Sequence, residues 1–262
     1  MISSLFVIIC VEKDLHMKRT LGLAVLTTVL SMSAISQIGP AAKQDSAAKP
    51  AAAAANAPLD LAKAALAAHG GEKLKKMRSL VMKGSVDLSV MGQAMPGAFS
   101  TAFSGEKYVF EINSVIQSLK QVYNGQQTYS SLPGFSLPPV TSLGFPLLPR
   151  VGDEGYIVTA LPVSAKKRKG FRITTPQGFY TDFIVDEKTG QIKGYESSYD
   201  VDGKIITTSV SVDSYQTIDG IVIPTKYSQR FDLGQLTAYA NFNTKTVLVN
   251  SPIEDDAFSI PK

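Results

Sequence analysis

Apolar and polar residues alternate with period two along much of the chain after residue 79. SVDLSVM (residues 85–91) and KYVFEIN (residues 107–113) each place their apolar side chains on one face. Strict alternation is typical of a β-strand with one buried face, although a one-residue shift in register would turn any side chain outward. The residues that we expect to point inward are Val86, Leu88, Val90, Tyr108, Phe110, Ile112, Phe183, Val185 and Phe242.

Turn signals separate the alternating segments. They include Asn124-Gly125, Asp202-Gly203 and Asp219-Gly220. Such pairs adopt the positive φ angles that tight hairpins require. Residues 179–250 are therefore predicted to form an antiparallel meander of about five strands, in a domain that is mainly β (α+β).

Helical patterns are confined to the two ends of this domain. Apolar residues near helical spacing predict a first helix over residues 58–69, which ends at Gly70 and Gly71, and a short turn over residues 72–77. One further helical turn is expected over residues 252–257. The chain end that follows it would then dock on the sheet.

The N-terminal residues read as an export signal and a tether. From Met17, two basic residues, an apolar run and small residues follow in the order of a secretory signal, which residues 1–16 do not fit. We expect a signal-peptide region over residues 1–36 with its true start at Met17; a longer signal or an anchored first segment is the alternative. The Ala- and Pro-rich residues 37–57 predict a flexible linker, and residues 58–262 the folded domain. A location in the periplasm or outside the cell follows from this interpretation.

Cysteine usage and charge narrow the function classes. The one cysteine, Cys10, lies in the expected leader, so the mature chain would have no disulfide, thiol nucleophile or thiolate metal site. A formal net charge of +4 is too small to favour nucleic acid and suits, at most, an anionic membrane surface. The basic run from Lys166 to Lys169 fits a solvated loop, with contact to anionic lipid head groups as the alternative.

Residue patterns for catalysis or metal binding are sparse. His69 stands at the expected helix end, where interaction with the exposed carbonyls is favoured over catalysis. Asp200, Asp202 and Gly203 begin like a calcium loop, but Lys204 follows and a hairpin turn fits better. No glycine-rich phosphate loop is visible. We expect a protein that is not an enzyme and has no cofactor or metal; a hydrolase built on Asp or Glu pairs is the least favoured class.

Four stretches of the domain carry a family resemblance. They are HGGEKLKKMRSLVMKGSVD, FIVDEKTGQIKGYESSY, VDSYQTIDGIVIPTKYSQRF and VLVNSPIEDDAFSIP. Through them, residues 58–262 resemble exported bacterial proteins related to the outer-membrane lipoprotein-sorting carriers of the LolA/LolB type. The resemblance implies a strongly curved antiparallel sheet, an incomplete barrel closed by helices and loops around an apolar cavity that shields acyl chains. The Ala-rich tether and the β-rich second half depart from the sorting carriers, which leaves the cargo open.

Residues 132–152, LPGFSLPPVTSLGFPLLPRVG, combine apolar side chains with five prolines. Proline excludes both a helix interior and a central strand, so this segment is predicted to be a loop. Our hypothesis is a movable lid over the concave face of the sheet, which an acyl chain would displace. The alternative is a loop that packs permanently into the core. The lid residues are Phe135, Leu137, Val140, Leu143, Phe145, Leu147 and Leu148.

The sequence therefore favours a non-catalytic periplasmic carrier or sensor of an acylated lipid or lipoprotein. The alternative is a β-rich envelope module with a filled core that binds another protein. An empty apolar cavity would favour the carrier, and an exposed apolar patch over a filled core would favour the module.

Overall fold

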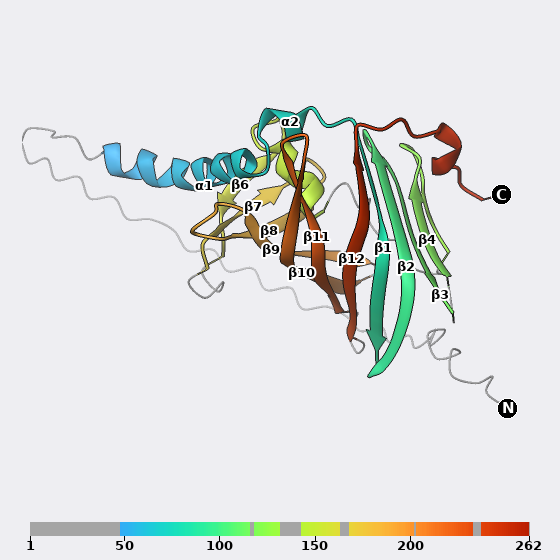
Figure 1. Cartoon of the computed structure of the whole chain (residues 1–262). Coiled ribbons are helices and arrows are strands. Elements are labelled where there is room, and N and C mark those ends of the chain that lie inside the picture. The colour runs from blue at the N-terminus through green and yellow to red at the C-terminus, as the bar shows by residue number, and fades with distance from the viewer. Residues whose placement is uncertain are drawn as a thin grey trace, which may run out of the picture. The chain divides into compact units, whose positions relative to one another are not determined.

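The structure, a computed structural model, describes residues 48–115, 118–131, 143–162, 168–201, 203–232 and 237–261. Twelve antiparallel strands in this part of the chain form one sheet, in the order β5-β4-β3-β2-β1-β12-β11-β10-β9-β8-β7-β6 (Figure 1). The strands are β1 (Ser79–Val90), β2 (Gln93–Ser104), β3 (Lys107–Ser114), β4 (Ser118–Tyr123), β5 (Thr128–Ser130), β6 (Ile157–Ala160), β7 (Gly170–Thr174), β8 (Tyr180–Val185), β9 (Ile192–Val201), β10 (Lys204–Ile218), β11 (Ile221–Asp232) and β12 (Thr237–Val249). The sheet is open, with β5 and β6 at its edges, and this confirms the expected incomplete barrel.

Neighbouring strands in the sheet are also neighbours in sequence, except where β1 meets β12. These two strands pair from Leu80 opposite Val249 to Val90 opposite Ala238. The five-stranded meander expected over residues 179–250 is confirmed by β8–β12. The β1–β12 pairing joins the two ends of the domain and places the middle of the chain at the sheet edges.

In the described part of the chain, four helices accompany the sheet. They are α1 (Ala48–Ala68), α2 (Glu72–Lys75) and the 3-10 helices η2 (Phe145–Arg150) and η3 (Asp255–Phe258). Helix α1 begins inside the 37–57 range that was expected to form a linker. Alanine is the strongest helix former, so this Ala-rich stretch can extend the helix as well as form a tether.

One face of α1 is buried. Ala62, Ala65, Leu66 and His69 are buried in sequence positions i, i+3, i+4 and i+7, the spacing of one helix face. The helix ends beside Gly70 and Gly71, as the sequence predicts.

Each face of the sheet carries its own apolar cluster. We call the inner face the one that packs with α1, α2 and η2; its buried residues include Leu80, Val86 and Phe99. The outer face carries Ala102 and Val109. Successive side chains of a strand point to opposite faces, so the two clusters come from alternate positions of the same strands.

The C-terminal segment covers part of the outer face. Phe258 of η3 is buried against Ala102, Val109 and Val122, with Ile260 packed beside them. The terminal helical turn and its docking on the sheet are thereby confirmed, with the turn shifted to Asp255–Phe258.

The sheet is bent toward α1. Register shifts occur between Lys83 and Gly84 in β1, between Ile184 and Val185 in β8, and near Ser214 in β10. Such bulges increase the local twist of a strand. Figure 1 shows β6–β9 lying near α1 at a steep angle to β1–β4.

Candidate functional site

An aromatic cluster occupies the middle of the inner face. The ring of Phe242 in β12 lies 5.0 Å from that of Phe99, 6.3 Å from that of Phe110 and 4.7 Å from that of Tyr227. Edge-to-face and offset pairs of this kind contribute about 0.5–1.5 kcal/mol each beyond their buried area. The cluster gives the inner face an aromatic centre that spans β2, β3, β11 and β12.

Helices cover only part of this face closely. Helix α1 packs on β6 and β7 and against η2, which also contacts α2. Farther along the sheet, six large side chains of the inner face are only partly buried, although Val86, Phe99 and Phe242 beside them are buried. The six are Leu88, Phe103, Phe110, Leu119, Tyr227 and Phe231.

Two hydrogen bonds hold the start of η2 on the sheet. The backbone N–H of Gly144 donates to Oγ1 of Thr181 over 3.0 Å. The second bond joins the backbone of Phe145 to the phenol of Tyr195. Burial raises the pKa of Tyr195 to about 12, and this hydrogen bond partly opposes the rise. Gly144 has a φ of 69°, and a Cβ there would lie 2.7 Å from Cε2 of Tyr195. Glycine is therefore required at this point by both the backbone angle and the contact.

The lid candidates of the sequence fall into three groups. Phe135, Leu137 and Val140 lie outside the described residues. Leu143 is half-buried. The remaining lid candidates, Phe145, Leu147 and Leu148, are buried in the inner cluster. Their displacement by a ligand stays a prediction.

The strand candidates share one face. By strand alternation and cross-strand pairing, the inner face receives Val86, Leu88, Val90, Tyr108, Phe110, Ile112, Phe183, Val185 and Phe242. The register expected from the sequence therefore agrees with the structure at these positions. Contact with a ligand remains a prediction for all of them.

His69 joins α1 to two strands. Its Nδ1–H donates to the carbonyl oxygen of Val222 over 2.8 Å, and its Nε2 accepts from the N–H of Ile192 over 3.0 Å. Burial lowers the pKa of His69 below its ordinary value of 6.5, partly opposed by the bond to Val222. Both ring nitrogens thus form hydrogen bonds with backbone groups of strands. The role of His69 therefore differs from the expected interaction with the carbonyls at the helix end.

A polar strip crosses the inner face on β8–β11, and the sequence patterns did not indicate it. Oγ1 of Thr181 lies 2.7 Å from Oγ of Ser197, which pairs across strands with Thr208. Nε2 of Gln229 donates to Oγ1 of Thr208 over 2.9 Å. Their period-two positions in the sequence could have placed these residues on the inner face, but their hydrogen bonds depend on the order of the strands.

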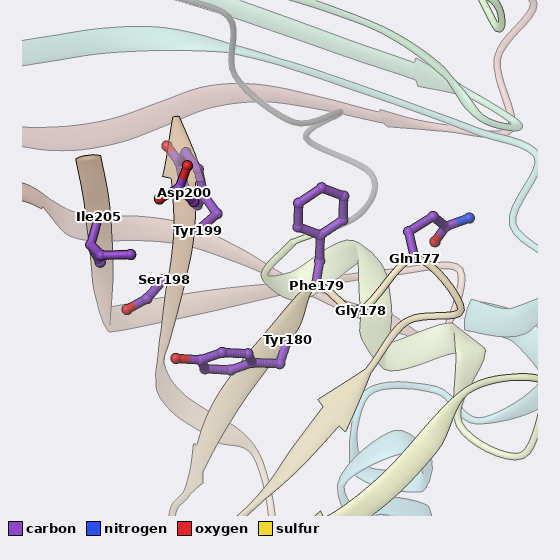
Figure 2. A pocket seen from close by; sticks show the side chains of 8 residues that line it. All are labelled: Gln177, Gly178, Phe179, Tyr180, Ser198, Tyr199, Asp200 and Ile205. Atoms are coloured by element: carbon purple, nitrogen blue, oxygen red, sulfur yellow. The ribbon is translucent and has the colours of Figure 1, made fainter. Parts of the chain in front are cut away.

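A shallow hollow lies where the β7–β8 turn meets the end of β9 and the start of β10 (Figure 2). It has a volume of about 320 Å³, and its lining includes Phe179, Tyr180 and Ile205. Its lining residue Ser198 lies 2.9 Å from Oγ1 of Thr207, and Asp200 accepts from the Gly203 N–H. These polar groups already serve the β9–β10 hairpin, as expected for Asp200, so the hollow indicates no chemistry of its own.

The charged side chains described below form ion pairs and do not gather into a binding site. Arg172 makes a two-pronged bond to Asp182, at 2.6 and 2.9 Å, and stacks over the ring of Tyr180 at 3.8 Å. Of the basic run, Lys166 and Lys167 lie outside the described residues. Among the residues that are described, no three His, Cys, Asp or Glu side chains are grouped to hold a metal ion. The described helices also include none with the length and apolar character needed to span a membrane.

No family model and no curated protein matches the chain in sequence. Among solved structures, it is similar to a DUF1329 family protein from Desulfovibrio piger (14% identity, 79% of this chain and 97% of that one, TM-score 0.47). It is also similar to a LolA superfamily protein from Nitrosomonas europaea (14% identity, 75% and 97%, TM-score 0.46). A third similarity is to the Mycobacterium tuberculosis lipoprotein LppX (15% identity, 76% and 98%, TM-score 0.22).

Proposed function

We propose that the protein is a non-catalytic carrier or sensor that shields an acyl chain of a lipid or lipoprotein on its inner face. One observation supports this most directly. Apart from the polar strip on β8–β11, the inner face is mainly apolar. Several of its large side chains, among them Leu88, Phe110 and Leu119, are only partly buried, although neighbours such as Phe99 and Ile112 are buried. An acyl chain lying there would gain about 0.8 kcal/mol for each methylene that it removes from water.

The proposed ligand site lies beside the closely packed region under α1. Phe110, Leu119 and Leu88 belong to three different strands and to one apolar cluster. An extended hydrocarbon chain can contact several strands at once and needs no specific polar group of the protein. A lipid tail therefore fits this surface better than a polar metabolite does.

An envelope module that binds another protein is the second candidate. The packing of η2 favours it, because Phe145, Leu147 and Leu148 are buried in the core and fill space that a ligand could otherwise use. Under that proposal the partly buried inner residues belong to an ordinary core. No cofactor or metal enters either proposal.

The proposed location is the periplasm or the exterior of the cell. It rests on the signal-like residues 17–36. Contact with an anionic membrane surface through the basic run at residues 166–169 belongs to the same proposal.

The test is native mass spectrometry of the full chain, exported and purified without detergent, followed by extraction with organic solvent. A co-purifying species with an acyl chain supports the carrier. A clean protein mass, together with no uptake of a fluorescent fatty-acid probe, contradicts it and favours the protein-binding module.

A further inference from the structure

A buried amide interrupts the apolar inner face on β4. Gln121 is 3% exposed, and its Nε2 atom has no hydrogen-bond partner among the described residues. It alternates with Val122 of the outer cluster and pairs across strands with Phe110 of the inner cluster. Its side chain therefore projects to the inner face.

This position is costly for the folded protein alone. A buried donor without a partner costs about 1–3 kcal/mol, whereas a leucine at the same place would add apolar packing. The nearby hydroxyl of Thr101 donates to the carbonyl of Val109 instead. Gln229 lies on the same face, and its Nε2 has a partner because it donates to Oγ1 of Thr208. Buried amides are normally paired in this way.

The chemistry of the surroundings restricts what could accept from Gln121. The neighbouring cation, Lys120, points to the opposite face and pairs with Glu111 at 2.9 Å. A carboxylate beside Gln121 would therefore not pair with Lys120, and an unpaired charge is strongly disfavoured in an apolar environment. A neutral carbonyl oxygen is an acceptor that this environment tolerates.

We propose that Gln121 binds the carbonyl oxygen of the ester or amide that links an acyl chain to its head group. This inference rests on the proposed acyl-binding function and refines it to a ligand class, acyl esters and amides. The linkage lies at β4, beside Phe110. The hydrocarbon chain then runs across β3 and β2 toward the aromatic cluster around Phe242.

Two lysolipids that differ in one carbonyl test the proposal. Lauroyl lysophosphatidylcholine carries an ester, and its dodecyl ether analogue has the same head group without the carbonyl. Calorimetric titration of the full chain, below the critical micelle concentrations, should show about fivefold tighter binding of the ester, the effect of one net hydrogen bond of about 1 kcal/mol.

Substitutions of two glutamines test whether the preference for the ester depends on Gln121. Gln121→Leu should abolish the preference for the ester while the ether binds as before, and Gln121→Met provides a second apolar variant if the first one does not fold. Gln229→Leu is the matched control, because its amide donor is already used, and should keep the preference. Equal binding of both lipids by the wild type, or a preference that survives in Gln121→Leu, overturns the inference and leaves the carrier function standing. Failure of the wild type to bind either lipid overturns the proposed function itself.

Discussion

His69 and Ile192 are joined across 123 positions of sequence by a 3.0 Å hydrogen bond in which the backbone N–H of Ile192 donates to Nε2 of the imidazole. The other ring nitrogen donates to the carbonyl of Val222. One side chain at the end of α1 therefore links β9 to β11. The arrangement requires a neutral imidazole, since a protonated Nε2 would face another donor.

The stability of the protein should fall in mild acid because of His69. Burial lowers the pKa of His69 in the folded state, so below pH 6.5 the unfolded chain takes up a proton that the folded chain resists. The stabilisation is complete above the unfolded pKa and is lost as the pH falls, by up to about 2 kcal/mol at pH 5. Urea unfolding at pH 7.5 and pH 5 should show a larger loss for the wild type than for His69→Gln. Equal losses in the two proteins would contradict this role.

A methyl group at Gly144 should loosen η2. Gly144→Ala places a Cβ against the ring of Tyr195 in a left-handed backbone, and we expect a loss of about 3 kcal/mol in the free energy of unfolding. Gly152→Ala is the matched control, because Gly152 also has a positive φ, of 85°, but nothing lies within 4 Å of its Cβ position. That variant should lose roughly 1 kcal/mol, and similar losses at both sites would mean that the contact with Tyr195 is unimportant.

The local patterns of the sequence predict most of the sheet. Period-two alternation and glycine-containing turns are short-range signals, and they suffice for β8–β12 and for the face on which Val86 and Phe110 lie. The pairing of β1 with β12 is different, since it joins segments about 160 residues apart and has no local signal. The closing of the domain therefore depends on tertiary packing.

The candidate site shows the same division between local and long-range information. The alternation of Leu119, Gln121 and Tyr123 in SLKQVY marks one strand face and could have placed Gln121 on it. That its Nε2 atom has no hydrogen-bond partner among the described residues follows only from the side chains of neighbouring strands. The extension of α1 to Ala48 was missed for another reason, because an Ala-rich composition is compatible with both a tether and a helix.

The outer cluster should be separable from ligand binding. Phe258 is 2% exposed and packs on the outer face, so Phe258→Ala should reduce the free energy of unfolding by about 3 kcal/mol without changing the affinity for a fatty-acid probe. Phe242→Ala removes a ring of similar burial from the inner aromatic cluster and should lower both stability and affinity. Chemical unfolding and probe fluorescence, both measured where the variants are folded, provide the comparison. Loss of affinity in Phe258→Ala would link ligand binding to the outer face.

A polar substitution on each face of the sheet tests the position of the acyl chain most simply. Leu88 in β1 is partly buried in the inner cluster, whereas Leu248 in β12 is 46% exposed and pairs with Val81 of the outer cluster. Leu88→Asn replaces apolar contact area with an amide that a hydrocarbon chain cannot satisfy, so we expect the affinity for a dansylated fatty acid to fall at least about fivefold. Leu248→Asn should leave it unchanged. If both variants bind the probe like the wild type, the inner face at β1 is core and not a ligand site, and the filled-core module becomes the better interpretation.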